Sequence, residues 1–184
     1  MKAVLLSIQP RWCELIANGK KTIEVRKNMP KIPTPFKCYI YCTQGEEKWL
    51  AGIIGETQPQ KLNSKVIGEF VCDKMYGIYY SMYPHDPPVF EEIGTLNRPD
   101  VLSETRLSEI ELGNYLNGNN GYGWHISALQ IYGKPKELDE FKKYNRKCYY
   151  SDLGLAIPNC QNCKSCQLDR APESWCYVEM QDER

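Results

Sequence analysis

The order of the predicted elements constrains the fold of this chain more than any other feature. Alternating and short apolar runs predict strands near residues 3–7, 22–27, 36–43, 66–71, 124–132 and 174–180. Two segments predict helices, one from Pro10 to about Gly19 and one from the capping box Ser108–Glu111 to about Gly118. Strands that follow one another with few crossover helices favour mixed or antiparallel pairing. The sequence therefore predicts an α+β protein, a small mixed or antiparallel β-barrel with two or three flanking helices.

Length and composition indicate one domain. The chain has 184 residues, a net charge of zero and no apolar run long enough for a membrane helix or a signal peptide. We expect a cytoplasmic protein without a membrane partner and with one domain over 1–184. The proline-rich stretch 79–101 is predicted to be an insertion, and 144–172 a cysteine-rich metal-binding loop. Neutrality excludes a chain that is basic throughout, and the oligomeric state stays open.

Charge is nevertheless uneven along the chain. Residues 11–37 contain seven basic and two acidic side chains, whereas residues 169–184 contain two basic and five acidic ones. The basic stretch includes the predicted strand 22–27, in which Ile23 and Val25 should face the core. Thr22, Glu24 and Arg26 should then share the open face. This pattern favours a site for an anionic ligand, although two solvated surfaces would give the same counts.

Nine cysteines without an export signal point to metal binding more than to disulfides. Cys160, Cys163 and Cys166 form C-x2-C-x2-C, a spacing that lets thiolates converge on one ion. Cys148 is the preferred fourth ligand and Cys176 the alternative. The spacing favours structural zinc, with an iron–sulfur cluster or unmetallated thiols as alternatives. A site closed by four thiolates would fasten a loop and would not catalyse.

The run Gly19-Lys20-Lys21-Thr22-Ile23-Glu24-Val25-Arg26 follows a helix that begins at the Pro10 end of Ser7-Ile8-Gln9-Pro10. These two motifs resemble the signature of the ASCH domain family, which has a PUA-like β-barrel. The later run Gly121–Ile126 resembles the closing strand of that family. The resemblance covers about residues 3–132 and the terminal strand.

The resemblance implies a cleft beside the strand 21–26 that binds RNA or a modified nucleoside or nucleotide. Cationic side chains suit phosphate, and aromatic rings suit base stacking. Glu24 would accept a hydrogen bond from an exocyclic amine. The predicted ligand-binding residues are Gln9, Trp12, Lys20, Lys21, Thr22, Glu24, Arg26, Trp124 and His125. Trp12 and Trp124 would alternatively fill the core, and His125 would alternatively be a plain polar residue.

Two other functions remain open. Some small ASCH proteins are amidohydrolases that remove an acyl group from a modified cytidine, and the resemblance then implies a catalytic role for Lys21. Glu24 stands where those enzymes have a threonine, and Glu109 is the nearest candidate for their distal glutamate. Lys21 and Glu24 would meet only if Lys21 lies in the turn before the strand or if a bulge intervenes. A protein-interaction module is the remaining alternative.

Overall fold

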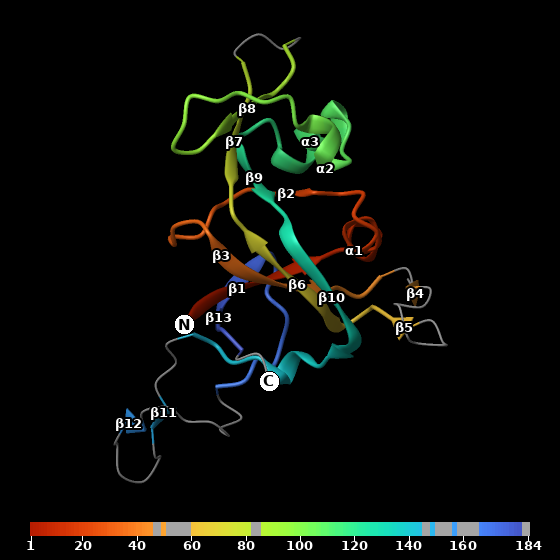
Figure 1. Cartoon of the computed structure of the whole chain (residues 1–184), viewed down its shortest axis with the longest axis vertical. Coiled ribbons are helices and arrows are strands. Elements are labelled where there is room, and N and C mark those ends of the chain that lie inside the picture. Colours follow the sequence, from red (N-terminus) through yellow and green to blue (C-terminus); the bar gives the residue numbers. More distant parts are fainter. Residues whose placement is uncertain are drawn as a thin grey trace. The chain divides into compact units, whose positions relative to one another are not determined.

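The computed structural model describes residues 1–45, 49–50, 60–81, 86–144, 148–149, 156–157 and 166–181 (Figure 1). Its elements, in chain order, are β1 (Lys2–Ile8), α1 (Pro10–Ala17), β2 (Ile23–Arg26), β3 (Phe36–Cys42), β4 (Trp49–Leu50), β5 (Gln60–Lys61), β6 (Lys65–Cys72), β7 (Met75–Tyr79), β8 (Val89–Glu92), α2 (Leu102–Thr105), α3 (Glu109–Leu116), β9 (Gly121–His125), β10 (Ser127–Lys136), the 3-10 turn η1 (Leu138–Glu140), β11 (Cys148–Tyr149), β12 (Ala156–Ile157) and β13 (Trp175–Glu179). The predicted α+β class is confirmed.

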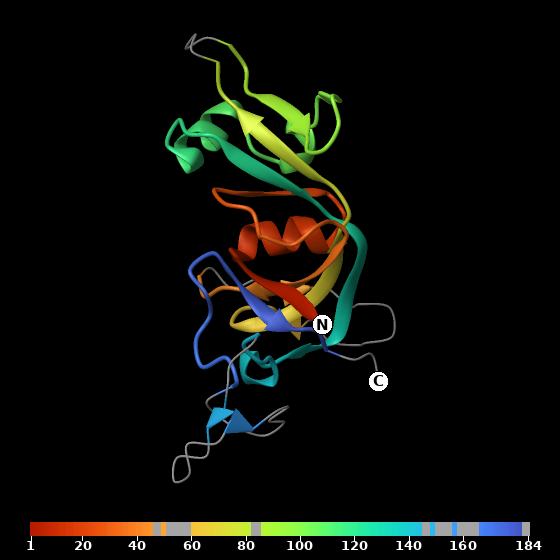
Figure 2. The same ribbon diagram turned by 90° about the vertical axis from the view of Figure 1, so that its left-hand side faces the viewer.

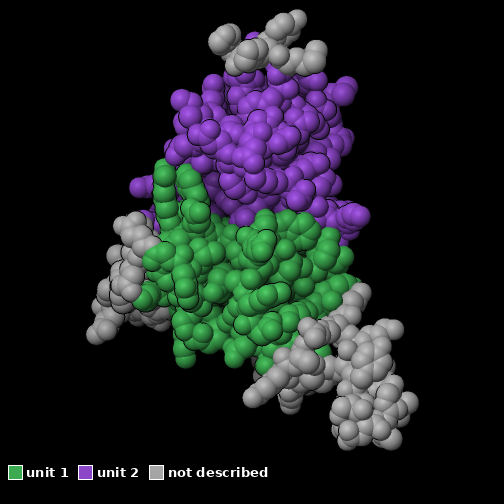
Figure 3. Space-filling model, turned by 180° about the vertical axis from the view of Figure 1, so that it is seen from behind, with its two compact units in different colours: residues 1–13, 37–69, 131–184 green, residues 14–36, 70–130 purple. Residues whose placement is uncertain are grey.

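The chain groups into two compact units, coloured green and purple in Figure 3. Unit 1 consists of residues 1–13, 37–69 and 131–184, and unit 2 consists of residues 14–36 and 70–130. None of the helices in the part of the chain that the structure describes is long and apolar enough to cross a membrane.

Unit 1 contains most of a five-stranded mixed sheet with the order β10-β6-β3-β1-β13. β1 runs parallel to β3 and antiparallel to β13, which lies beside it in Figure 2. Tyr39 and Phe141 meet edge to face in the core of this unit, with ring centroids 4.9 Å apart. The buried residues of that core are Ala3, Leu5, Tyr39, Tyr41, Val66, Phe141, Leu168 and Val178.

Unit 2 contains an antiparallel sheet with the order β2-β9-β7-β8, accompanied by α2 and α3. The predicted capping box is present at the start of α3, where Ser108 and Glu111 satisfy each other's backbone N–H groups. The buried residues of this core are Ile23, Val25, Tyr76, Ile78, Phe90, Val101, Leu112 and Leu116.

Three details of the predicted fold need correction. The stretch 79–101 contains a strand that the sequence pattern did not predict, since β8 forms within it and pairs with β7. The single strand predicted at 124–132 is divided at Ile126, since β9 and β10 pair in different sheets. The predicted closed barrel is also corrected, because the described strands form two separate open main sheets. One sheet has β10 and β13 as its edge strands, and the other has β2 and β8.

Candidate functional site

The site begins at the turn between α1 and β2, within unit 2. Gly19 adopts a left-handed conformation with φ of 66°, where a residue without Cβ is favoured, and the N–H of Gly19 donates to Ile16 O. The N–H groups of Lys20 and Lys21 then both donate to Leu15 O. Lys21 therefore lies in the turn and not in the strand, which is the condition under which it can meet Glu24 on β2.

Lys21, Glu24 and Arg26 form a buried ion cluster. Lys21 Nζ lies 3.4 Å from Glu24 Oε2, and Arg26 NH2 lies 3.0 Å from Glu24 Oε1. Both carboxylate oxygens are thus engaged by cations of this chain. A carboxylate buried in this way is stabilised by its partners, because an unpaired buried charge would be very costly.

The burial of this cluster corrects the expectation of an open strand face. The predicted alternation is right, since Ile23 and Val25 belong to the core of unit 2. However, Glu24 and Arg26 are only 6% and 5% exposed, and Lys21 only 2%. Glu24 pairs across the sheet with Trp124, which is fully buried, so this face of β2 is covered as well.

A short segment at the end of α2 makes hydrogen bonds to each of the three turn residues from Lys20 to Thr22. The backbone N–H of Thr22 donates to Glu104 O at 3.1 Å, and its hydroxyl donates to Glu104 Oε2 at 2.8 Å. Lys21 Nζ donates to Thr105 O at 2.6 Å, and Arg106 Nε donates to Lys20 O. Residues 104–106, which we call the strap, thereby hold residues 20–22 and bury the Lys21 ammonium.

The cluster holds two cations and one anion, and this imbalance affects proton affinity. Burial lowers the pKa of Lys21 below its usual value, because Glu24 only partly offsets the loss of hydration, and Arg26 lowers it further. The Arg26 guanidinium donates a hydrogen bond to the hydroxyl of Tyr115 on α3. Burial nevertheless raises the pKa of Tyr115, because it outweighs the effect of Arg26. Shifted titrations in one place are typical of functional sites, although structural ion networks also produce them.

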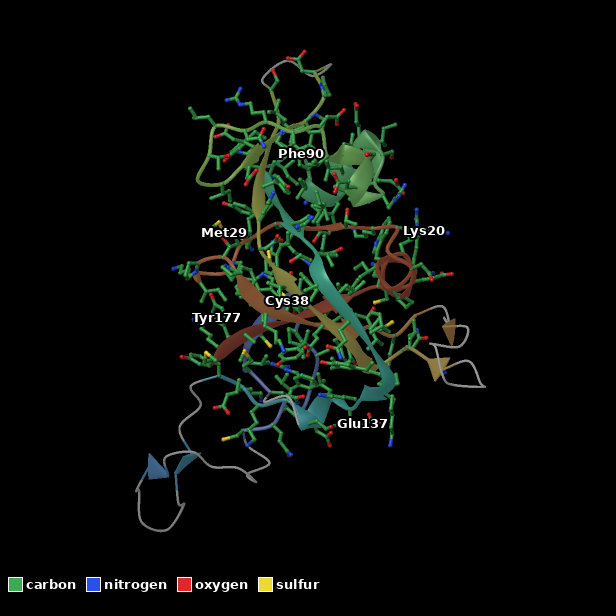
Figure 4. The ribbon with its side chains drawn as sticks, viewed as in Figure 1. Lys20, Met29, Cys38, Phe90, Glu137 and Tyr177 are labelled. Atoms are coloured by element: carbon green, nitrogen blue, oxygen red, sulfur yellow. The ribbon has the colours of Figure 1, made fainter. Side chains whose placement is uncertain are left out.

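Exposed cations surround the cluster. Lys20, labelled in Figure 4, and Arg106 are exposed where the strap meets the turn. Lys27 is exposed just after β2, with its ammonium 5.6 Å from the centroid of the Tyr115 ring. Tyr115 itself is 39% exposed. We call Lys20, Lys27, Arg106 and Tyr115 the rim of the site.

The remaining ligand-binding candidates lie in different surroundings. Trp124 packs edge-on against Phe36 at 5.7 Å in the interior. His125 is partly exposed, and its Nδ1 lies 2.6 Å from Asp73 Oδ1. Burial acts to raise the pKa of Asp73, yet the hydrogen bond and charge of His125 hold it below the usual value. Gln9 and Trp12 belong to unit 1, where the Arg11 guanidinium lies 4.4 Å from the Trp12 ring.

The acidic candidate Glu109 lies at the exposed start of α3, whereas Glu104 hydrogen-bonds to the turn. Sequence reasoning missed Glu104 together with Thr105, Arg106 and Tyr115. The one available signal was the acidic residue Glu104 just before the capping box, and nothing in the sequence tied it to Thr22. The contact spans 82 positions and depends on how α2 is placed beside β2.

The predicted metal ligands fall mostly outside the described residues. Cys160 and Cys163 lie outside them, and only the backbone of Cys148 is described. Cys166 is buried, and the N–H of Lys143 donates to its carbonyl at 2.8 Å. Cys176 is partly buried on β13, and burial raises its pKa to about 11. No group of three potential ligands occurs within the described part of the chain.

Comparisons with known proteins found similarity to one family model and to several solved structures. Residues 6–40, which include the turn and β2, match the family model of the ASCH domain. The chain is similar to the crystal structure of ASCH from Zymomonas mobilis, with 19% identity over 74% of each chain and a TM-score of 0.49. Structures of two point mutants of that protein give 19% and 20% identity, cover 76% and 74% of this chain and 78% and 75% of theirs, and have TM-scores of 0.47. No curated protein sequence matches the chain.

Proposed function

We propose that this chain is an ASCH protein that binds RNA or a modified nucleoside at the rim around the Lys21–Glu24–Arg26 cluster. The observation that carries the proposal is this buried, positively unbalanced cluster, bordered by exposed cations, inside the segment that matches the ASCH domain model. Five basic side chains (Lys20, Lys21, Arg26, Lys27 and Arg106) adjoin two carboxylates (Glu24 and Glu104). Such an excess attracts a polyanion.

The rim supplies the two kinds of contact that a single-stranded nucleic acid needs. Lys20, Lys27 and Arg106 are exposed, so they can approach phosphate without losing a buried partner. The exposed part of the Tyr115 ring offers a surface for base stacking, which is worth about 1–3 kcal/mol per base in other systems. The buried cluster would hold this surface in place, because Arg26 contacts both Glu24 and the Tyr115 hydroxyl.

Equilibrium binding of a fluorescein-labelled, single-stranded RNA at several salt concentrations tests this proposal. Lys27→Ala and Arg106→Ala should each weaken binding several-fold and reduce the dependence of log K on log salt concentration by about one charge. Lys134→Ala is the matched control, since Lys134 is an exposed lysine in unit 1. Equal loss in the control, or unchanged affinity in both rim variants, would refute the placement of the site.

A second candidate function is hydrolysis of an acylated cytidine, favoured by one observation. Lys21 lies 3.4 Å from Glu24 and has a lowered pKa, which increases the fraction of neutral amine that can act as a base. Lys21 would accept a proton from a water molecule as the water oxygen adds to the acyl carbon. The C–N bond then breaks, and the proton passes to the departing amine nitrogen, with Glu24 as carrier. Glu104 is better placed than Glu109 to serve as the distal carboxylate, because Glu104 contacts the turn.

The enzyme is tested by incubating the protein with N-acetylated cytidine and measuring released cytidine. Lys21→Met should abolish turnover, and Lys134→Met, which changes an exposed lysine of unit 1, should retain it. No turnover by the wild-type protein at high concentration would exclude this function and leave the binding proposal standing.

We also propose that the cysteine-rich loop binds one structural zinc through Cys160, Cys163, Cys166 and either Cys148 or Cys176. The support is the C-x2-C-x2-C spacing. A closed thiolate site would stabilise the loop and take no part in either candidate activity of unit 2.

A further inference from the structure

Unit 1 contains three neighbouring aromatic side chains, two of which contact the ammonium of Lys2. Lys2 Nζ lies 3.5 Å from the centroid of the Tyr177 ring and 5.3 Å from that of Tyr144. The rings of Trp175 and Tyr177 meet edge to face, with centroids 5.3 Å apart and planes at 72°. Tyr177 is labelled in Figure 4. We call Tyr144, Trp175 and Tyr177 the aromatic site.

The local structure explains why these rings come together. Trp175 and Tyr177 are two residues apart on β13, so their side chains share one face of the strand. In the antiparallel pairing of β1 with β13, Tyr177 lies opposite Val4, which places it diagonal to Lys2 on the same face. Tyr144 is brought alongside by its N–H, which donates to Tyr177 O at 3.2 Å.

We propose that the aromatic site is a binding site for a methylated ammonium group, such as the side chain of trimethyllysine, and that Lys2 occupies it in the absence of ligand. Aromatic rings attract cations through the negative potential of their faces, and clusters of them recognise quaternary ammonium groups. The Lys2 ammonium, 3.5 Å from the ring centroid, shows that the face of Tyr177 accepts a primary ammonium.

Charge favours a cationic ligand over a nucleic acid at this place. Residues 169–184, which supply two of the three rings, contain five acidic and two basic side chains. The neighbouring cation Lys143 is already paired, with its Nζ 2.8 Å from Asp169 Oδ1. Glu179, which is exposed, lies opposite Lys2 in the register of β1 and β13. The excess of acidic side chains in this segment of the sequence repels a phosphate and attracts an ammonium group.

Competition between Lys2 and the ligand follows from hydration. A primary ammonium is strongly hydrated and loses three water contacts when it enters an aromatic site. A trimethylated ammonium has no N–H donors, so it loses less hydration and gains contact with the rings. The ligand should therefore displace Lys2, and removal of the Lys2 side chain should strengthen its binding.

The test is an NMR titration of the full chain with trimethyllysine amide, following the Trp175 indole and the amides of β13. We expect saturable shifts for the wild-type protein, at least about three-fold tighter binding for Lys2→Ala, and loss of saturation for Tyr177→Leu. Tyr177→Phe retains the ring and should retain binding. Because Tyr177→Leu removes a ring that packs against Trp175, it is used only if its amide spectrum away from β13 matches that of the wild type.

Two controls decide whether the interaction is the proposed one. The neutral isostere with a tert-butyl group in place of trimethylammonium should bind at least about five-fold more weakly. Lys136→Ala is a control, because Lys136 Nζ lies 4.7 Å from the centroid of Tyr132, a ring outside the aromatic site. This substitution should not alter the affinity for trimethyllysine amide. Equal binding of the isostere, equal gain in Lys136→Ala, or absence of saturation in both the wild type and Lys2→Ala would each overturn the proposal.

Discussion

Each compact unit contains a glutamate whose two oxygens are both engaged, and the two arrangements differ in charge balance. In unit 1, Glu69 Oε1 lies 2.7 Å from Lys37 Nζ, and Glu69 Oε2 accepts a hydrogen bond of 2.6 Å from the Tyr132 hydroxyl. One cation and one neutral donor thus match one anion. In unit 2, Glu24 is held by two cations, Lys21 and Arg26, and one positive charge remains uncompensated.

The electrostatic consequences of the two arrangements are opposite. Although burial acts to raise the pKa of Glu69, its hydrogen bonds from Lys37 and Tyr132 lower it, so the folded state favours the charged carboxylate. In unit 2 burial lowers the pKa of Lys21, so the folded state disfavours the charged ammonium. The Glu69 arrangement therefore stabilises the fold, whereas the Lys21 arrangement retains a charge that costs stability. A retained cost of this kind is expected where a ligand later supplies the missing charge.

The largest expected effect is that of removing the central anion of each cluster. Glu24→Gln leaves Lys21 and Arg26 buried beside a neutral amide, and it should lower the free energy of unfolding by about 3–5 kcal/mol. Glu69→Gln leaves one partly buried cation and should cost about 1–2 kcal/mol. Urea unfolding followed by far-UV circular dichroism measures both. A smaller loss for Glu24→Gln than for Glu69→Gln would show that the excess charge in unit 2 is not important.

Removal of the proposed zinc should increase amide hydrogen exchange in unit 1 and not in unit 2. We expect about one zinc per chain in protein purified without chelator. Its removal should speed amide hydrogen exchange about ten-fold or more in residues 166–168 and 175–178 and leave β9 of unit 2 unchanged. Elemental analysis and exchange mass spectrometry measure the two quantities. Less than about half a zinc per chain would contradict the metal site.

Acid should reveal the contribution of Glu69. Because its pKa is lowered in the fold, this contribution is present above the unfolded-state value near 4.5 and disappears as the pH falls through the folded-state value. The wild type should therefore exceed Glu69→Gln in stability by about 1–2 kcal/mol at pH 7, and the difference should shrink below about pH 4.5. Parallel urea titrations from pH 3 to 7 measure it. A difference that is independent of pH would contradict the assignment.

At alkaline pH, the contribution of Lys21 to the free energy of unfolding should increase as the pH rises. Between its lowered folded-state pKa and the unfolded-state value of 10.5, the unfolded chain binds more protons at this position, so stability contributed by Lys21 rises with pH. Relative to Lys21→Met, the wild type should gain a few tenths of a kcal/mol per pH unit as the pH approaches 10, by the same linkage. Thermal unfolding of both proteins from pH 7 to 10 measures this. A stability difference between the two proteins that stays constant from pH 7 to 10 would contradict this expectation.

Much of the local structure was predictable because it depends on neighbours in the sequence. The strand from Lys2, the helix from Pro10 and the Ser108 capping box follow from short-range periodicity and hydrogen bonding. The requirement that Lys21 lie in a turn if it is to meet Glu24 also followed from strand geometry. The strap and Tyr115 were not predictable, because their contacts with the turn and with Arg26 span most of unit 2.

By itself the sequence determined which side chains alternate along β2, since a period of two is a property of the extended backbone. It also placed Lys21, Glu24 and Arg26 within a few residues of one another. Only the tertiary structure decided that all three are buried, because burial depends on Trp124, on the strap and on how the sheet of unit 2 pairs. Charge density can be read along a chain, but the hydration that sets its energetic cost is a property of the folded molecule.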